Sequence, residues 1–247
     1  MKAVFLAAGF ATRMYPLTRH HAKPLLEVGG EALLTRLLRQ ALAAGIDEAA
    51  VVVNARFEDD FLAWSEEVEC PVPLHVVANG AREDHELRGA VADLALALAR
   101  AFPDGSPDGY LVIAGDNLLG FGLAQHAARF RELGQPLLLV RELPPPVPPR
   151  TYSDVELGDG GRVRSFREKP EDPRGGHSAI GVYFLPAELP LRVSDYLAAG
   201  GNPDAPGHFI AWLAERGPVH AAAIAGSWHD VGSLEGYRSA RDSFAPS

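Results

Sequence analysis

Short apolar runs alternate with amphipathic segments through the first half of the chain. Strand-like runs lie at residues 2–7, 49–53, 74–78, 110–114 and 136–140. Segments with helical spacing lie between them, at residues 31–44, 57–66, 87–101 and 123–133. Apolar strands of this length, separated by helices, favour parallel β-α-β units with both faces of the sheet covered.

The pattern changes at the proline-rich run 144–149, which is typical of a stiff connector. Further strand-like runs follow at residues 152–157, 162–167, 178–185 and 220–224. The first two flank a Gly/Asp turn and predict a hairpin. The remaining segments predict helices, the last beginning at Ser233. We therefore predict one α/β domain over residues 1–247. We expect a Rossmann-like, three-layer α/β/α architecture with a mixed, mostly parallel central sheet, in which the proline run is a crossover.

Composition narrows the class of protein. A hydrophobic share of 47% with 22% charged residues is typical of a soluble globular domain. The formal net charge of −9, from 32 acidic and 23 basic residues, argues against a nucleic-acid partner. A small phosphorylated substrate would need a local basic pocket. Only three of the basic residues are lysines, namely Lys2, Lys23 and Lys169.

Localisation follows from the cysteine content and the apolar runs. Cys70 is the single cysteine, so the sequence offers neither a disulfide nor a zinc cluster. The apolar start breaks at Gly9 and is followed by Arg13, which favours a buried strand over a signal peptide. No apolar stretch is long enough to span a bilayer. We expect a cytoplasmic protein with no membrane partner, and a homo-oligomer stays open.

The segment after the first strand carries the main chemical signal. Its residues 6–18 read LAAGFATRMYPLT, and Lys23-Pro24 follows. In open α/β sheets ligands bind at the ends of the strands, and small residues there expose backbone N–H groups to phosphate oxygens. Arg13 and Lys23 would add cationic partners. The segment contains neither G-x-G-x-x-G nor G-K-[ST], so it is neither a dinucleotide-binding fingerprint nor a Walker loop.

These residues resemble the signature of the sugar-1-phosphate nucleotidyltransferases, a superfamily that includes glucose-1-phosphate thymidylyltransferases and mannose-1-phosphate guanylyltransferases. Further matching segments follow in the expected order, at residues 114–117 (AGDN), 167–170 (REKP), 178–183 (SAIGVY) and 228–232 (WHDVG). The likeness covers nearly the whole chain. It implies the nucleotide-diphospho-sugar transferase fold, with residues 1–143 as a nucleotide-binding half and 150–247 as an acceptor-binding half.

The resemblance also implies a reaction and a set of site residues. A nucleoside triphosphate would be joined to a sugar 1-phosphate, giving a nucleotide sugar and pyrophosphate. The implied catalytic residues are Arg13, Lys23 and Asp116. The implied nucleotide contacts are Leu6, Ala7, Ala8, Gly9, Ala11, Thr12, Arg13, Asn79 and Gly89. The implied acceptor contacts are Lys23, Glu168, Lys169 and Gly181.

The same resemblance assigns Asp116 and Asp230 to a Mg²⁺ site. Magnesium prefers carboxylate and phosphate oxygens and usually takes one or two protein carboxylates. Two structural interpretations stay open beside this one. Asp116 could cap a helix that begins before Leu118, and Asp230 could be a polar residue preceding a cap at Gly232-Ser233. We expect Asp93 to face solvent or to cap a neighbour and not to touch the nucleotide.

Three departures from the family pattern matter. Ala11 stands where the family has a second glycine, so we expect either a negative φ or some strain there. Tyr152-Ser153 replaces a Tyr-Gly pair, and residues 202–209 replace an acidic stretch. The last two departures leave the acceptor open. Alternatives are therefore a cytidylyltransferase for a non-sugar phosphate such as phosphocholine, and a catalytically silent regulatory paralogue. A dehydrogenase would need the fingerprint that is missing.

Overall fold

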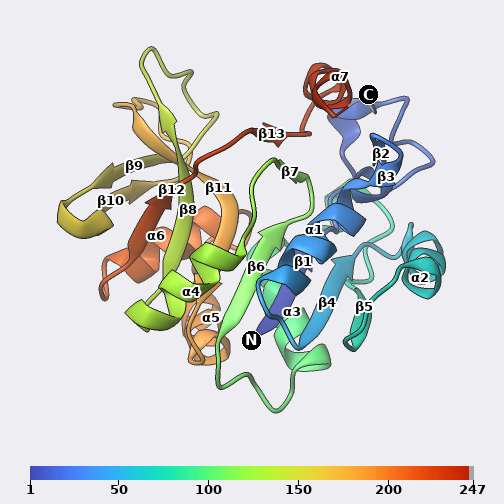
Figure 1. Ribbon diagram of the computed structural model, residues 1–247, viewed down its shortest axis with the longest axis horizontal. Helices are drawn as coiled ribbons and strands as arrows, with labels where there is room; N and C mark the ends of the chain where they lie inside the picture. Colours follow the sequence, from blue (N-terminus) through green and yellow to red (C-terminus); the bar gives the residue numbers. More distant parts are fainter. Residues whose placement is uncertain (245–247) are drawn as a thin grey trace.

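Nine strands form one sheet through the middle of the protein (Figure 1). The structure is a computed structural model and describes residues 1–244. The strands run in the order β10-β9-β11-β6-β1-β4-β5, with β8 beside β11 and β12 beside β8. Their bounds are β1 (Lys2–Leu6), β4 (Glu48–Val53), β5 (Leu74–Ala78), β6 (Tyr110–Ala114), β8 (Leu137–Leu143), β9 (Asp154–Leu157), β10 (Val163–Arg167), β11 (Gly176–Leu185) and β12 (His220–Ala223). Only β10 and β11 run against the rest, which confirms the predicted mixed, mostly parallel sheet.

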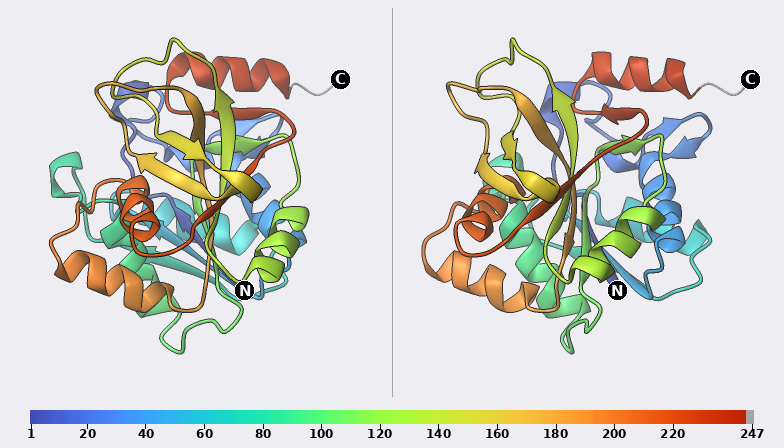
Figure 2. Two further views of the ribbon diagram at one scale, coloured as in Figure 1. Left: turned by 90° about the vertical axis from the view of Figure 1, so that its left-hand side faces the viewer. Right: turned by 60° about the vertical axis from the view of Figure 1, so that its left-hand side comes forward.

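Helices cover both faces of this sheet (Figure 2). Helices α1 (Leu33–Ala43), α2 (Glu58–Glu67) and α4 (Ala124–Leu133) pack on one face, and α3 (Ala90–Ala101), α5 (Leu189–Ala198) and α6 (Pro206–Ala214) pack on the other. Strand β1 shows why the strands are apolar throughout. Ala3 and Phe5 belong to the hydrophobic core between the sheet and α1, α2 and α4. Val4 between them belongs to the core between the sheet and α3, α5 and α6, because successive side chains of a strand point to opposite faces. The three-layer prediction is confirmed.

A third, smaller core lies above the sheet. It joins the loop after β1 to the end of the chain, and its members are Met14, Leu26, Val28, Leu33, Leu118, Val231 and Ala240. The final helix, α7 (Leu234–Ser243), begins as predicted at Ser233, whose Oγ accepts a hydrogen bond of 3.0 Å from the Gly236 amide. This core holds α7 over the loop that carries Arg13.

Several short elements have no signal in the sequence pattern. They are η1 (Thr12–Met14), η2 (Lys23–Leu25), β2 (Glu27–Val28), β3 (Glu31–Ala32), η3 (Asp84–Glu86), β7 (Asn117–Leu119), η4 (Asp159–Gly161) and β13 (Trp228–Asp230). Helix α3 begins at Ala90 instead of Leu87, because Gly89 has a φ of +97° that a helix does not allow. The hairpin β9-β10 forms as predicted. The sheet crosses the boundary between residues 1–143 and 150–247, and the division of function between these halves stays a prediction.

Candidate active site

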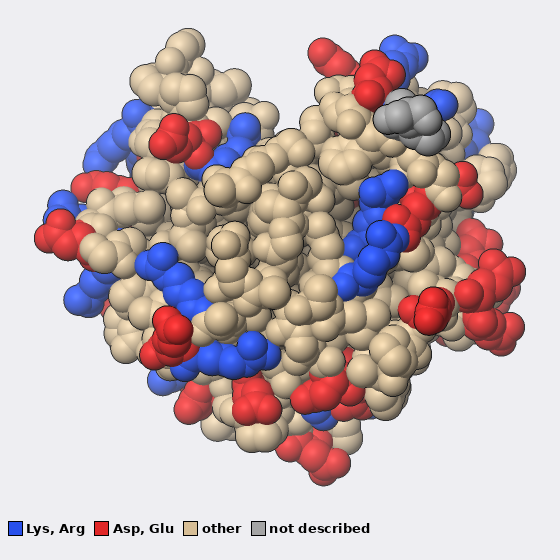
Figure 3. All heavy atoms as spheres, in the orientation of Figure 1, with Lys and Arg blue, Asp and Glu red and all other residues tan. Residues whose placement is uncertain are grey.

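The predicted site residues gather at one edge of the sheet. Strands β1, β5 and β6 are parallel, so their carboxyl ends meet at the upper edge in Figure 1. Viewed as spheres in Figure 3, the surface above this edge is hollowed between the loop that follows β8 and helix α7. One cavity here, of about 410 Å³, is lined by Arg13, Arg141, Tyr152, Trp228, His229, Asp230, Gly232, Ser233, Glu235, Gly236 and Ser239.

The loop after β1 is held in a fixed conformation. Ala11 has φ +49° and ψ +44°, so of the two expected outcomes the strained one is found. The Met14 amide and the Thr18 hydroxyl both donate to the Ala11 carbonyl, at 2.9 and 2.8 Å. Thr18 is buried. These two bonds keep Ala11 in a conformation that its side chain disfavours, and they place the exposed Arg13 on η1.

Two further hydrogen bonds fasten the start of the loop. The amide of Asn54, a buried side chain after β4, donates to the Ala8 carbonyl at 3.0 Å. The Gly115 amide donates to the Leu6 carbonyl at 2.8 Å. A side chain on Gly115 would come to 3.0 Å from that same carbonyl, so glycine lets the β6 end approach β1 closely. Asn54 was not predicted, and the sequence gives no signal for it.

Lys23 and Asp116 form an ion pair at this edge of the sheet. The Lys23 Nζ lies 2.7 Å from the Asp116 Oδ2, and the two side chains are 14% and 33% exposed. Burial alone would raise the pKa of Asp116, but the Lys23 ammonium and, more weakly, the Arg13 guanidinium hold it below its usual value. Asp116 therefore stays charged next to two cations.

The short strands β7 and β13 bring Asp230 to Asp116. They pair antiparallel, with Asp230 opposite Asn117, and the Val231 amide donates to the Asp116 carbonyl at 3.0 Å. Burial and the negative charge of Asp116 raise the pKa of Asp230, so the two carboxylates are close enough to repel each other. Residues 117–119 are a strand, which excludes the interpretation of Asp116 as a helix cap. The two aspartates are 114 residues apart in sequence and adjacent in space.

A cation of the right kind would find oxygen ligands here. Within residues 1–244 no three side chains of His, Cys, Asp or Glu converge to form a metal cluster. Two carboxylates whose repulsion a divalent cation would relieve fit a hard ion that takes its other ligands from phosphate oxygens. The residues present therefore fit magnesium. His229 adjoins the site but packs against the Phe244 ring, with 5.9 Å between ring centroids.

Arg141 is a site residue that sequence reasoning missed. Its guanidinium lies between two rings, 4.7 Å from the centroid of Tyr152 and 4.8 Å from that of Trp228. The Arg141 Nε is buried without a hydrogen-bond partner among the described residues. Trp228 is in turn fixed by a 2.6 Å hydrogen bond from its Nε1 to the Asn117 Oδ1. Strand β8 continues to Leu143, beyond the predicted end, and so carries Arg141 to this edge.

Three of the predicted acceptor residues, Glu168, Lys169 and Gly181, lie on or next to β10 and β11, whereas Lys23 lies on η2. Glu168 is 11% exposed and fills the space that a side chain at Gly207 would need, since a Cβ there would approach the Glu168 Oε2 to 1.9 Å. Burial raises the pKa of Glu168, against the opposing effect of Lys169. The Lys169 Nζ is half exposed and 4.0 Å from the Glu168 Oε1. Gly181 has φ +74° and lies against Ala114. A side chain there would point toward the Ala114 Cβ, at 3.0 Å.

Four of the predicted nucleotide contacts, Leu6, Ala8, Gly9 and Gly89, line a second cavity. Its lining is Leu6, Ala8, Gly9, Asp84, Leu87, Gly89, Ala90, Asp93 and Asp204. Asn79 is engaged within the protein, because its Nδ2 donates to the Asp93 Oδ1 at 2.9 Å and its Oδ1 accepts from the Ala81 amide at 3.0 Å. Of the two expected positions of Asp93, the one facing solvent is wrong, because the residue is buried. Its contact with the neighbouring Asn79 agrees with the other.

Comparison with known proteins identifies the family. The family model described as nucleotidyl transferase matches residues 2–245. The chain therefore belongs to the nucleotidyl transferase family.

Two curated relatives are similar over most of this chain. The UTP–glucose-1-phosphate uridylyltransferase of Synechocystis sp. is 26% identical, covering 96% of this chain and 61% of the relative. The glucose-1-phosphate thymidylyltransferase of Streptomyces griseus is 27% identical, covering 95% of this chain and 63% of the relative. The chain thus spans less than two thirds of the length of these relatives. Sugar nucleotidyltransferases generally use a divalent metal ion.

A solved structure shares the whole fold. The crystal structure of UDP-glucose pyrophosphorylase complexed with UDP-glucose matches with a TM-score of 0.79 and 20% identity, covering 98% of this chain and 97% of that one. This likeness confirms the predicted fold. None of the helices formed by residues 1–244 has the length and apolarity that a membrane crossing needs. The cytoplasmic location and the oligomeric state stay predictions.

Proposed function

We propose that this nucleotidyl transferase joins a nucleoside triphosphate to a sugar 1-phosphate and releases pyrophosphate. One observation carries the proposal: the pairing of β7 with β13 places Asp230 beside Asp116, with Lys23 in contact with Asp116 and Arg13 on the same hollow. The relatives named above act on glucose 1-phosphate by their names, which supports a sugar 1-phosphate as the acceptor.

The reaction asks for positioning and charge compensation. An oxygen of the sugar phosphate forms a bond to the α-phosphorus, and the bond from that phosphorus to the bridging oxygen breaks, so the electron pair leaves with pyrophosphate. The attacking oxygen is already anionic near neutral pH, and no general base is required. The enzyme must instead bring two polyanions together and stabilise the negative charge that spreads over the α-phosphate. A hollow with arginine, lysine and paired carboxylates can do this.

The cations would divide this work. Arg13 stands on the exposed turn η1 and would bind the triphosphate and the charge that develops on it. Lys23 and Lys169 would neutralise the sugar phosphate. Lys23 keeps its position through the contact with Asp116, whereas Lys169 is half exposed and free to move toward an incoming acceptor.

Asp116 and Asp230 would hold a magnesium ion. When bound, the ion would neutralise negative charge on the phosphates, which the aspartates cannot do because they are negative themselves. The two carboxylates also orient their neighbours without it: Asp116 fixes the Lys23 ammonium, and the Asp116 backbone carbonyl fixes β13 through Val231. Loss of the Asp116 carboxylate would therefore disturb both the ion and the lysine, whereas loss of the Asp230 carboxylate would disturb the ion.

Glu168 would bind the hydroxyl groups of the sugar. Its carboxyl group is mostly buried, and its place against Gly207 gives it one orientation. Within residues 1–244 no hydrogen bond reaches this carboxyl group, and a buried acceptor of this kind favours a ligand that can donate hydrogen bonds. Leu6, Ala8 and Gly9 would lie against the nucleoside, with Gly89 opposite them across the second cavity. Ala7 is buried beneath the loop. Thr12, which precedes Arg13 in the sequence, is exposed.

The test is pyrophosphate release over a matrix of nucleoside triphosphates and phosphorylated acceptors, with and without Mg²⁺. We expect release with at least one sugar 1-phosphate and only when Mg²⁺ is present. Asp104→Asn makes the same chemical change as Asp116→Asn on an exposed turn at the opposite edge of the sheet and serves as the control. Release of pyrophosphate with phosphocholine but with no sugar phosphate would show that the acceptor is a non-sugar phosphate. No release with any pair would refute the proposed activity.

A further inference from the structure

The cavity beside the start of helix α3 has an unusual lining for a nucleotide site. It measures about 430 Å³, and three of its lining residues are acidic: Asp84, Asp93 and Asp204. No lysine or arginine lines this cavity. A phosphate group would be repelled from such a cavity. Of the cations of the site, Arg13 lines the other cavity, and Lys23 is paired with Asp116.

The backbone of α3 does not offer an alternative phosphate site. The first amide groups of a helix are free to bind anions in many proteins. Here the Ala90 amide donates to the Asp204 carbonyl at 3.0 Å, and the Val91 amide donates to the Pro203 carbonyl at 2.9 Å. The loop 202–204 thus occupies the N-terminus of the helix. The cavity suits an uncharged part of the substrate that carries hydrogen-bond donors.

Asp93 is the residue of this cavity that is built into a fixed position. Its side chain is 7% exposed. The Asn79 amide, itself locked by the Ala81 backbone, donates to one of its oxygens, and the described residues give its carboxylate no other hydrogen-bond partner. Burial raises the pKa of Asp93, which the Asn79 hydrogen bond partly offsets. A buried carboxylate with unused acceptor capacity costs free energy unless a ligand donates to it.

We propose that Asp93 selects the nucleobase and that the base it selects is guanine. The proposal rests on the proposed function, which makes the substrate a nucleoside triphosphate. A carboxylate only accepts hydrogen bonds, and guanine presents two adjacent donors, N1–H and N2–H, to a pair of carboxylate oxygens. The N3–H of uracil or thymine is flanked by two carbonyl oxygens that a carboxylate repels. Adenine and cytosine each place an acceptor nitrogen beside their amino group.

The position of the cavity supports this selection. Gly9 at the end of β1 and Gly89 before α3 both line it, so a planar base can approach backbone on either side. A side chain at Gly89 would also collide with the Pro203 carbonyl, at 2.2 Å. Asp84 and Asp204 are exposed at the cavity and add to a negative potential that favours the donor edge of guanine.

The test compares base preference in the wild type and in Asp93→Asn. One measurement is kcat/KM for GTP, UTP, dTTP, CTP and ATP with one acceptor. A second is calorimetric binding of GDP and UDP with Mg²⁺ and no acceptor, which needs no turnover. We expect the wild type to prefer the guanine nucleotide by about 10- to 100-fold, the range for a hydrogen bond to a charged group. In Asp93→Asn the preference should fall at least about 10-fold, because an amide can both donate to and accept from uracil.

The controls keep each outcome decisive. Asp104→Asn should retain the wild-type ratio, and thermal unfolding of Asp93→Asn shows whether the variant is folded. If Asp93→Asn does not fold, Asp93→Glu, which retains the carboxylate, should keep the sign of the guanine preference. Turnover of UTP or dTTP in preference to GTP by the wild type would overturn the guanine assignment and leave the proposed function standing. Binding of GDP over UDP without turnover of any triphosphate would support the assignment and refute the activity. Equal binding of both diphosphates would overturn the assignment.

Discussion

The two cavities at the upper edge of the sheet have opposite electrostatic designs. In the hollow under α7, Lys23 pairs with Asp116, and Arg13 and Arg141 add positive charge around Asp230. In the cavity beside α3, three carboxylates occur with no lysine or arginine in the lining. Both cavities begin at the loop after β1. The difference shows that a chain with net charge −9 can still present arginine side chains locally, in one of these two cavities.

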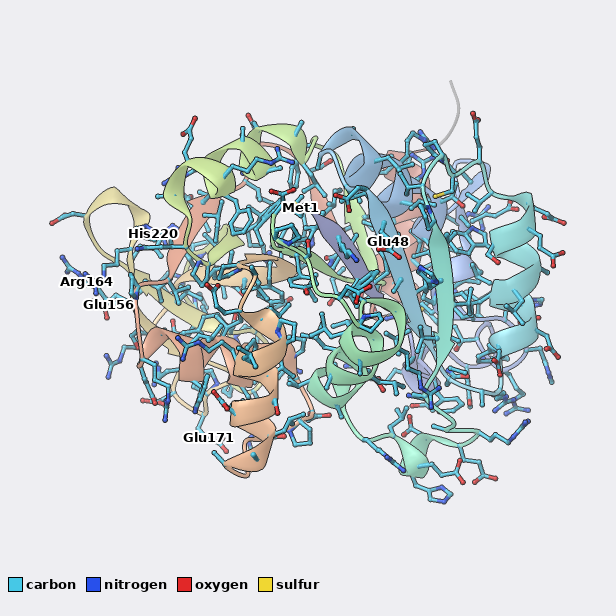
Figure 4. The ribbon with its side chains drawn as sticks, turned by 90° about the horizontal axis from the view of Figure 1, so that it is seen from below. Met1, Glu48, Glu156, Arg164, Glu171 and His220 are labelled. Atoms are coloured by element: carbon cyan, nitrogen blue, oxygen red, sulfur yellow. The ribbon has the colours of Figure 1, made fainter. Side chains whose placement is uncertain are left out.

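The three lysines of the sequence also differ in where they lie and in what they contact. Lys23 and Lys169 lie at the predicted site, whereas Lys2 lies at the opposite edge, 2.7 Å from Glu48. Figure 4 shows that edge, with Glu48 on β4 and Met1 at the start of β1. Glu48 also bonds His75 at 2.8 Å, and its pKa is lowered because both partners outweigh the effect of burial. Lys2 thus joins β1 to β4 at the edge opposite the predicted site.

The largest effect should follow from loss of charge in the cationic hollow. Asp116→Asn removes a proposed metal ligand and the partner of Lys23, so we expect kcat to fall by about 1,000-fold. Folding should change little, since the backbone bond to Val231 remains. Steady-state kinetics and a thermal melt provide the two measurements. A folded variant with a near-normal kcat would remove Asp116 from the site.

Arg13→Ala should have the next largest effect. Loss of the guanidinium that stabilises charge on the α-phosphate should slow the single-turnover rate by about 100-fold. Rapid-quench measurement at saturating substrates isolates this step from product release. Arg19→Ala, a change on the same loop at a side chain over the Tyr15 ring, is the matched control. Equal rates in the two variants would contradict the role of Arg13.

Lys169→Ala should affect the acceptor alone. We expect the KM for the sugar phosphate to rise about 10-fold, with kcat and the KM for the nucleotide nearly unchanged. Alanine is the appropriate replacement because Lys169 has φ +44°, and glycine would also relieve backbone strain. An unchanged acceptor KM would show that Lys169 stays in solvent throughout the reaction.

The smallest expected effect is the pH dependence of the free energy of unfolding that the buried Asp93 of the acidic cavity causes. The pKa of Asp93 is raised from 3.8 by burial, so the folded state binds a proton more tightly than the unfolded state. The free energy of unfolding of the wild type should therefore decline, relative to Asp93→Asn, as pH rises from 3.8 through the raised pKa, and then level off. Asn79, Asp84 and Asp204 are the polar groups around it. Urea unfolding at a series of pH values measures the difference, and a wild type that gains relative stability over this range would contradict it.

The sequence was most informative where chemistry and spacing agree. The loop 6–18, Asp116 and Asp230 could be named from local motifs, and the structure brings them to one edge. Asp93 was expected to face solvent or a neighbour, since a charged residue in a helix is usually exposed. Its burial against Asn79 could not be seen from the local sequence. Arg141 could not have been predicted, because its two aromatic partners come from separate segments.

What the sequence alone determined is the order of strands and helices and the identity of the charged groups. Period-two and helical spacing of apolar residues depend only on neighbours along the chain, so they can be read from it. The tertiary structure decided which charges meet. The pairing of β7 with β13 rests on three residues in each strand, too few to leave a periodic pattern, and it joins positions more than a hundred residues apart. That contact depends on the core around Val231 and α7, a packing property of the whole fold.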